Sequence, residues 1–285
     1  HKSHHLMVLG ATIPAMNFYN PGLLEETYFS DSNTIKDSAM DKQNIQGTIK
    51  AIKEKYEAFV ENIEYKYFDE FVDRFINANA DRYHFITEEA VHFVQKYRDK
   101  YAVEDMMVSF SGGKDSTVTS HIVNRALGTN KVLHVFGDTT LEFPYTIEYK
   151  KRFNKNEESQ GVRILTAKNR EKNFEELCEV VGPPSRVMRW CCTVFKTGAI
   201  QKTIASAFKD KSNILSFQGI RHNESASRSK YERESESPKI SKQTVASPII
   251  DWIDYDVWLY ILTTKIDFNY AYRLGWTRVG CWCCP

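Results

Sequence analysis

Short apolar runs alternate with amphipathic segments through most of this chain. The apolar runs predict strands at 106–110, 131–136, 162–165, 213–218 and 248–250. Apolar positions at helical spacing predict helices at 87–100, 144–153, 171–180, 195–207 and 254–263. Strands that alternate with helices indicate a mostly parallel sheet with right-handed crossovers, which binds ligands at the carboxyl ends of its strands.

The start of the chain follows a different pattern. Residues 36–80 show an apolar stripe at helical spacing, which begins with Ile52, Tyr56, Phe59 and Ile63 and continues with Phe68, Phe71 or Val72, and Phe75. We expect a helical subdomain there that packs on the core or on another subunit. The opening His-Lys-Ser-His-His is typical of an expression tag, so its histidines are not candidate metal ligands.

The pattern divides the chain into a mostly helical N-terminal extension, 1–100, and an α/β domain, 101–285. Thr87, which two glutamates follow, predicts the N-terminus of the helix 87–100 through a hydroxyl cap and acids in the first turn. Residues 222–243 are polar and charged, which predicts a long mobile loop.

A polar loop, Ser-Gly-Gly-Lys-Asp-Ser at 111–116, joins the strand 106–110 to a helical pattern. Two glycines let the backbone approach a phosphate closely, and the N–H groups at the start of the following helix would face the anion. The loop is neither a Walker loop nor a Gly-x-Gly-x-x-Gly loop. The alternative is a glycine-rich surface turn. The candidate nucleotide-binding residues here are Ser109, Ser111, Gly112, Gly113, Lys114, Asp115 and Ser116.

Polar residues also follow two other predicted strands. Asp138 and Thr139 come after 131–136, where a carboxylate can bind a nucleotide hydroxyl or help to hold Mg²⁺ at the phosphates. Helix capping before the next helix is the alternative. Gly219, Arg221 and Arg228 come after 213–218. Arginine there can bind phosphate or sulfate through two hydrogen bonds, and an exposed loop charge is the alternative.

Charge and composition exclude several functions. The 38 Lys+Arg residues balance 37 Asp+Glu, so a nucleic-acid contact would need a local patch. No apolar run is long enough for a membrane span and no secretory signal is visible, so we expect a cytoplasmic protein.

The cysteines gather in two short stretches. Cys191 and Cys192 are adjacent, and Cys281 and Cys284 form a C-x-x-C pair. This pattern favours metal or redox chemistry over disulfides. Four thiolates suit zinc or an iron–sulfur cluster. Because adjacent cysteines are unusual in zinc sites, we favour a 4Fe-4S cluster. Cys283 stays open as a free thiol, another ligand or a packed residue.

The phosphate loop closely resembles the PP-loop of ATP pyrophosphatases, which have the adenine-nucleotide alpha-hydrolase (Rossmann-like) fold. Together with the other motifs, residues 90–285 resemble the phosphoadenosine phosphosulfate reductase family. Its adenylyl sulfate reductases bind a 4Fe-4S cluster through similar cysteines but have a degenerate loop. Its sulfate-adenylating subunits keep the loop but lack the cysteines. The ATP-pyrophosphatase subunits of DNA phosphorothioation systems combine both, as this chain does.

The resemblance implies an enzyme that cleaves ATP to AMP and pyrophosphate and adenylates an acceptor for sulfur transfer, in DNA phosphorothioation or a related thiolation. Lys114, Asp115 and Arg221 would be catalytic, with ATP and Mg²⁺ bound. Partners would include a cysteine desulfurase or another sulfur donor, DNA through partner proteins, and further copies of the chain. Alternatives are a reductase of adenylyl sulfate or its 3′-phosphate and a non-catalytic nucleotide-binding scaffold. Thr140 stands where the family often has glycine.

Overall fold

The computed structural model describes residues 66–155, 161–185, 187–237 and 242–281. Two compact units are distinguished, one of His1–Asn77 with Tyr272–Thr277 and the other of Ala78–Ala271 with Arg278–Pro285. Helix α5 (Lys66–Ala78) begins the described part of the chain. Residues 52–63 of the predicted apolar stripe lie outside the described residues, and the part of the stripe from residue 68 to residue 75 lies in α5.

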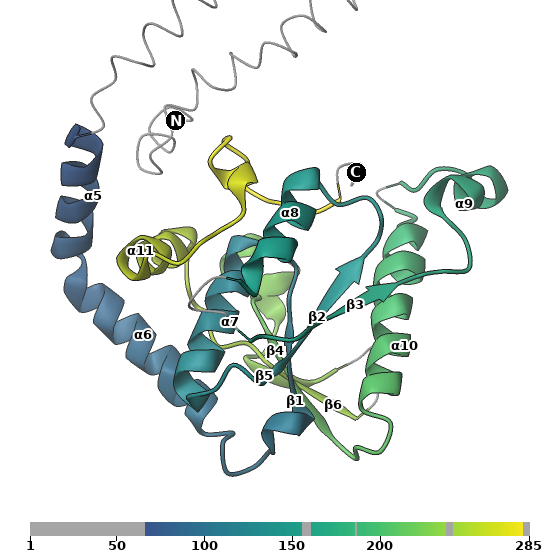
Figure 1. Ribbon diagram of the computed structural model, residues 1–285, viewed down its shortest axis with the longest axis horizontal. Helices are drawn as coiled ribbons and strands as arrows, with labels where there is room; N and C mark the ends of the chain where they lie inside the picture. Colours follow the sequence, from purple (N-terminus) through teal and green to yellow (C-terminus); the bar gives the residue numbers. More distant parts are fainter. Residues whose placement is uncertain (1–65, 156–160, 186, 238–241, 282–285) are drawn as a thin grey trace, which may run out of the picture. The chain divides into compact units, whose positions relative to one another are not determined.

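The second unit contains a six-stranded sheet in the order β3-β2-β1-β4-β6-β5 (Figure 1). Neighbouring strands are parallel, except that β5 is antiparallel to β6. This confirms the predicted α/β class. The strand order reverses between β1 and β4, which is where such sheets bind ligands. The strands are β1 (Met106–Ser109), β2 (Leu133–Asp138), β3 (Ile164–Lys168), β4 (Ile214–Gln218), β5 (Glu234–Glu236) and β6 (Gln243–Ala246).

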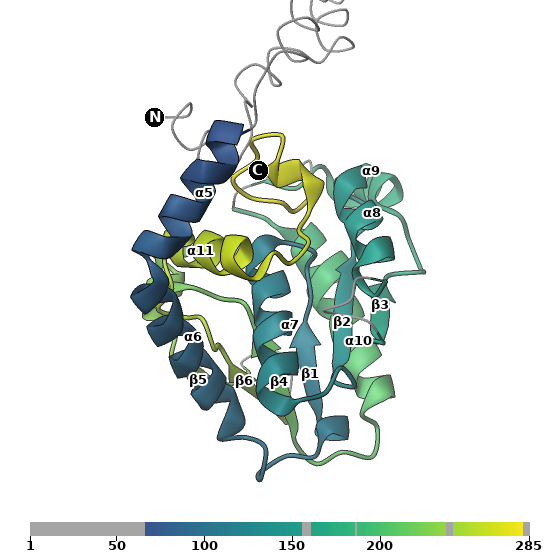
Figure 2. The ribbon, with the colours of Figure 1, turned by 60° about the vertical axis from the view of Figure 1, so that its left-hand side comes forward.

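Helices cover both faces of the sheet (Figures 1 and 2). On one face Phe136 of β2 packs with Tyr149 and Phe153 of α8. On the other face the next residue back, Val135, packs with Ile204 of α10. Alternate side chains of a strand point to opposite faces, so β2 is buried on both sides. The α-helices of this unit are α6 (Ala80–Gln95), α7 (Lys114–Leu127), α8 (Pro144–Phe153), α9 (Phe174–Val181), α10 (Gly198–Ala207) and α11 (Asp254–Thr264).

Shorter helical turns complete the described elements. Those of the 3₁₀ type are η2 (Val103–Asp105), η5 (His222–Glu224), η6 (Arg228–Lys230) and η7 (Tyr270–Tyr272). A π-helix, η4 (Cys192–Thr197), leads directly into α10.

A buried histidine fixes α7 on the sheet. Burial lowers the pKa of His134 to about 4, so the ring is neutral near pH 7. Its Nδ1 lies 2.9 Å from the Val132 carbonyl oxygen and therefore carries the proton. Its Nε2 lies 2.7 Å from Ser120 Oγ of α7 and accepts the hydroxyl hydrogen. These hydrogen bonds fix the position of α7 along β2. They therefore also fix the position of the loop that precedes α7.

A second polar contact fixes the start of α11. Asp256 is fully buried and accepts two hydrogen bonds from the guanidinium of Arg82 on α6, at 2.9 and 2.8 Å. It also accepts from the Ile253 N–H at 3.0 Å, which caps the first turn of α11. A buried carboxylate needs such partners, so this contact holds α6 and α11 together.

Three predicted elements differ from the structure. Residues 222–243 contain η5, η6, β5 and the first residue of β6. The predicted strand 248–250 is a turn, because Ile250 N–H bonds back to the Ser247 carbonyl oxygen. Helix α6 begins at Ala80, so Thr87 lies in its interior and is buried. Within the described residues, no helix is long and apolar enough to cross a membrane.

The turn that follows β2 carries backbone strain. Thr140 has φ 68°, a left-handed conformation that suits glycine, the residue the family often has there. Asp138 Oδ1 accepts from the Thr140 N–H at 2.9 Å and holds the turn in place. With threonine in place of glycine, the turn therefore keeps its left-handed conformation at residue 140, and the backbone there is strained.

Replacing Thr140 by glycine should raise the free energy of unfolding by about 1 kcal/mol, because the strain of a branched side chain at positive φ exceeds the entropy cost of glycine. Urea unfolding followed by circular dichroism measures this. Thr140→Ala is the control: it keeps a Cβ, so it should recover little of the gain. Equal stability of the glycine variant and wild type would show that the turn is unstrained.

Candidate active site

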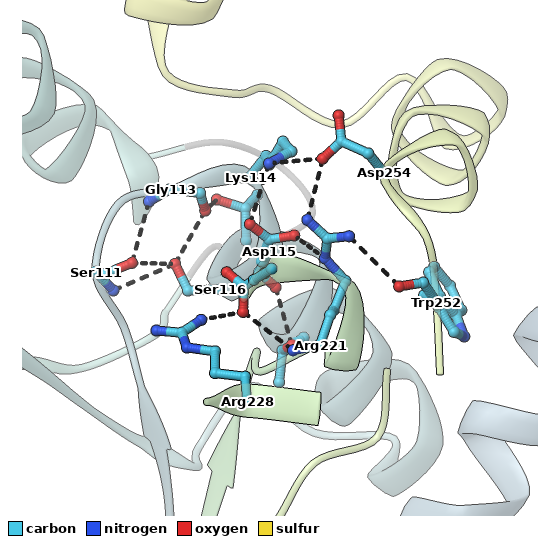
Figure 3. Close-up of polar contacts among 12 residues, drawn as sticks. Ser111, Gly113, Lys114, Asp115, Ser116, Arg221, Arg228, Trp252 and Asp254 are labelled. Atoms are coloured by element: carbon cyan, nitrogen blue, oxygen red, sulfur yellow. Dashed lines mark hydrogen bonds and ion pairs between the residues drawn. The ribbon is translucent and has the colours of Figure 1, made fainter. Parts of the chain in front are cut away.

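The phosphate loop is held closed by its own hydroxyl groups. Ser116 Oγ donates to the Gly113 carbonyl oxygen at 2.9 Å and accepts from the Ser111 N–H at 3.2 Å. Ser111 Oγ lies 3.1 Å from Ser116 Oγ (Figure 3). Helix α7 then begins at Lys114 with no side-chain cap. The first N–H groups of such a helix lack partners within the helix, so they can bind an anion.

Two contacts shape the loop from outside. Gly112 has φ 72°, and a Cβ there would lie 3.0 Å from a methyl carbon of Thr146 on α8. Asn269, which is buried, donates to the Gly112 carbonyl oxygen at 3.2 Å and to Thr146 Oγ1 at 2.9 Å. Asn269 therefore holds the loop against α8, a role for which no local sequence pattern gives a signal.

Four charged side chains meet beside the loop (Figure 3). Lys114 Nζ lies 3.2 Å from Asp115 Oδ2 and 3.1 Å from Asp254 Oδ1. Arg221 Nε lies 2.6 Å from Asp115 Oδ1, and its Nη2 lies 3.0 Å from Asp254 Oδ1. The side chains of Lys114 and Arg221 are 5% and 4% exposed, so each needs an anion beside it. The structure thus brings together the three predicted catalytic residues and adds Asp254.

Gly219 allows this meeting. A Cβ on Gly219 would lie 2.7 Å from the backbone carbonyl carbon and oxygen of Asp115 and 2.9 Å from Thr119 Oγ1. The chain leaving β4 can therefore pass against α7 only because residue 219 has no side chain. Arg221 lies two residues further on, and its side chain reaches Asp115 at the start of α7. Gly219 therefore has a packing role in the structure, and its nucleotide-binding role stays a prediction.

The other predicted residues lie around this centre. Arg228 forms an ion pair with Glu224, whose carboxylate also accepts from the Arg221 N–H at 3.1 Å. Asp138 caps its own turn. Ser109 ends β1, paired in register with Gln218 of β4. All of them lie at or beyond the carboxyl ends of strands, as the sequence predicted.

The cysteine stretches approach each other near the end of β2. Cys281 forms a bridge with Glu142, and its Sγ lies 3.3 Å from Thr139 Oγ1. Burial raises the pKa of Cys191 to about 11, and its neighbours Cys192 and Cys281 add to the rise. Burial likewise raises the pKa of Cys281, with Cys192 contributing. The three thiols therefore share one environment.

A π-helix places the vicinal cysteines. Cys192 and Lys196 both lie in η4, and π-helical turns occur frequently at functional sites. A Cβ on Gly137, in β2, would lie 3.5 Å from Cγ of Lys196 and 3.1 Å from Ile200. The stem of Lys196 thus lies against β2 near its carboxyl end, and its charge lowers the pKa of Cys281 against the effect of burial.

The structure describes three of the four predicted metal ligands. Among the residues that the structure describes, no group of three or more Cys, His, Asp and Glu side chains is gathered tightly enough to hold a metal ion. Cys191, Cys192 and Cys281 are half-buried free thiols, and Cys284 lies outside the described residues. The cluster assignment of the four cysteines therefore stays a prediction.

Residues 105–285 match the phosphoadenosine phosphosulfate reductase domain family. An uncharacterized protein of Methanocaldococcus jannaschii is 35% identical over 221 residues, which is 78% of this chain and 44% of that protein. A second protein of that organism is 32% identical over 219 residues, 75% of this chain and 50% of its own length. The chain thus spans about half the length of these relatives.

Relatives with named activities match shorter parts. An adenosine 5'-phosphosulfate reductase of Neisseria meningitidis is 33% identical over 95 residues, 33% of this chain and 35% of that protein. Among solved structures, a phosphoadenylyl-sulfate reductase from Candida auris, a phosphate complex, has TM-score 0.51 at 15% identity, covering 71% of this chain and 95% of that one. At this identity the likeness shows the fold.

The fold and the phosphate loop define a nucleotide-binding α/β protein of the PP-loop type. The chain belongs to the phosphoadenosine phosphosulfate reductase family, a family of nucleotide-processing enzymes. The predicted family and fold are therefore confirmed.

The contact at Gly219 can be tested by adding a methyl group. Gly219→Ala should lower the free energy of unfolding by about 1–3 kcal/mol, because the Cβ would force the β4 loop away from α7. It should also weaken ATP binding, measured by titration calorimetry, because Arg221 would move with the loop. Gly280→Ala is the matched control, since a Cβ there meets nothing within 4 Å. If Gly219→Ala matched wild type in both measurements, the close approach of Gly219 to α7 would be needed neither for stability nor for ATP binding.

Proposed function

We propose that the protein is an ATP pyrophosphatase that adenylates an acceptor for sulfur transfer. The observation that carries this proposal is the intact phosphate loop with the buried Lys114 and Arg221 beside it. Two buried cations at a helix N-terminus suit a ligand with several negative charges, such as the β and γ phosphates of ATP. The cysteines at the end of the neighbouring strand support sulfur chemistry on the same edge of the sheet.

The reaction would take place at the α phosphorus. An acceptor oxygen attacks it, and the bond to the bridging oxygen breaks, so pyrophosphate leaves with the electron pair. Lys114 and the first N–H groups of α7 would stabilise the charge that develops on pyrophosphate. The carboxylate of Asp115 offers hard oxygen ligands for Mg²⁺ at the phosphates, and Mg²⁺ would neutralise part of that charge.

Sulfur transfer would follow adenylation. A phosphate or carbonyl oxygen is a poor leaving group, and adenylation makes it part of AMP, which a sulfur nucleophile can displace. Cys191, Cys192, Cys281 and Cys284 would hold a 4Fe-4S cluster, which would supply a place for sulfur beside the acceptor or brace the site. We propose DNA phosphorothioation or a related thiolation as the process, with a cysteine desulfurase or similar donor as partner.

A second candidate is an iron–sulfur reductase of a sulfonucleotide. The Neisseria reductase, identical at 33% of positions over 95 residues, favours it, as do the cysteines. The same two cations would then bind the phosphate and sulfate of the sulfonucleotide. Thioredoxin-dependent release of sulfite from adenylyl sulfate would support this candidate, whereas AMP and pyrophosphate from ATP would support the first.

Removing the loop lysine tests the proposed reaction. Lys114→Ala should lower the release of AMP and pyrophosphate from Mg²⁺-ATP by about 10²–10³-fold, because the charge on the leaving group loses its nearest cation. Lys202→Ala is the control: this exposed lysine pairs with Glu171, away from the loop. Turnover by Lys114→Ala equal to that of wild type, in a folded variant, would contradict the role given to Lys114.

Metal analysis tests the cysteine assignment. Protein purified without oxygen should contain iron and acid-labile sulfide, and Cys191→Ser should lose both, because one of four thiolate ligands is missing. Cys178→Ser, in α9, is the control and should keep them. Stoichiometric zinc in place of iron would refute the cluster.

A further inference from the structure

The two carboxylates beside the phosphate loop contact the two cations in different ways. Asp254 Oδ1 lies 3.1 Å from Lys114 Nζ and 3.0 Å from Arg221 Nη2, so one oxygen atom contacts both buried cations. Asp115 contacts the same two cations through different oxygens. The Asp254 side chain is 43% exposed, whereas that of Asp115 is 16% exposed.

An oxygen between an ammonium and a guanidinium has the surroundings that a phosphate oxygen would have in this site. Lys114 and Arg221 are too deeply buried to lie without an anion, so something must neutralise them when no nucleotide is bound. Asp254 is the group that can leave most easily, because its carboxylate is already partly in water and belongs to the first turn of α11.

We propose that Asp254 is a stand-in for phosphate: its carboxylate occupies the anion position in the substrate-free protein, and pyrophosphate or the phosphate tail of a nucleotide displaces it. Asp115 stays with Arg221 during this exchange and keeps the arginine in place. This inference rests on the proposed function for the identity of its ligand, and it assigns Asp254 a positioning role for the two cations.

The charge of Asp254 affects metal-free and metal-bound phosphates to different extents. A metal-free pyrophosphate meets the negative charge of Asp254 and must displace it unaided. A pyrophosphate with bound Mg²⁺ carries less negative charge, so the same carboxylate repels it less. Removing the charge of Asp254 should therefore change the affinity for metal-free pyrophosphate more than the affinity for the magnesium complex.

Titration calorimetry with inorganic pyrophosphate tests the inference on the whole chain. Asp254→Asn should bind metal-free pyrophosphate about tenfold more tightly than wild type, because a like charge is removed beside two buried cations. The gain should be smaller when Mg²⁺ is present. Asp254→Glu keeps the charge and should resemble wild type. Asp251→Asn makes the same charge change three positions away, on a carboxylate paired with His222, and should also bind as wild type does.

If Asp254→Asn does not fold, Asp254→Ser removes the same charge, and serine suits the first turn of a helix. Unchanged or weaker binding of metal-free pyrophosphate by the neutral variants would overturn the inference, and so would an absence of binding in wild type and variants alike. ATP cleavage is measured on the same preparations. Tighter pyrophosphate binding by the neutral variants without any ATP cleavage would support the role of Asp254 as a stand-in for phosphate and contradict the proposed function. ATP cleavage with unchanged pyrophosphate affinity in the variants would support the proposed function and contradict the role of Asp254.

Discussion

A buried guanidinium needs a carboxylate, and Arg221 finds one in Asp115, across the point where the strand order reverses. This pair joins the loop that leaves β4 to the helix that leaves β1. The two segments are far apart in sequence, and each would lose an ion-pair partner for a largely buried charge without the other. The phosphate loop therefore owes its shape to a long-range ion pair as well as to its own glycines.

The sequence predicted those features that depend on local patterns of residues. The strand, loop and helix between residues 106 and 127 were predicted correctly because each has a strong local pattern, and α8 has the predicted bounds, 144–153. The sequence placed Lys114, Asp115 and Arg221 at the carboxyl ends of predicted strands. That β1 and β4 are neighbours, which brings the three residues together, comes from the structure.

Other features could not be predicted because they depend on contacts between distant segments. Asp254 begins a helix, where an acidic residue is ordinary, and only the position of α11 brings it to Lys114. Asn269 gave no local signal for its bonds to Gly112 and Thr146. β5 was predicted as loop because Glu-Ser-Glu has no apolar alternation; it forms a strand by pairing with β6. Thr87 was read as a cap because local pattern cannot tell a helix start from a buried interior position.

The composition of β5 has a consequence for the protein in a crowded cell. The outer strand of an open sheet presents unpaired backbone groups, to which a strand of another molecule can add. Here that strand runs antiparallel to the rest, is three residues long and carries Glu234 and Glu236. Glu234 is further engaged by Tyr97 and Lys96. A short edge strand with two acidic side chains disfavours pairing with a strand of another molecule. The sheet is therefore not expected to extend beyond β5 by adding a strand from a second molecule.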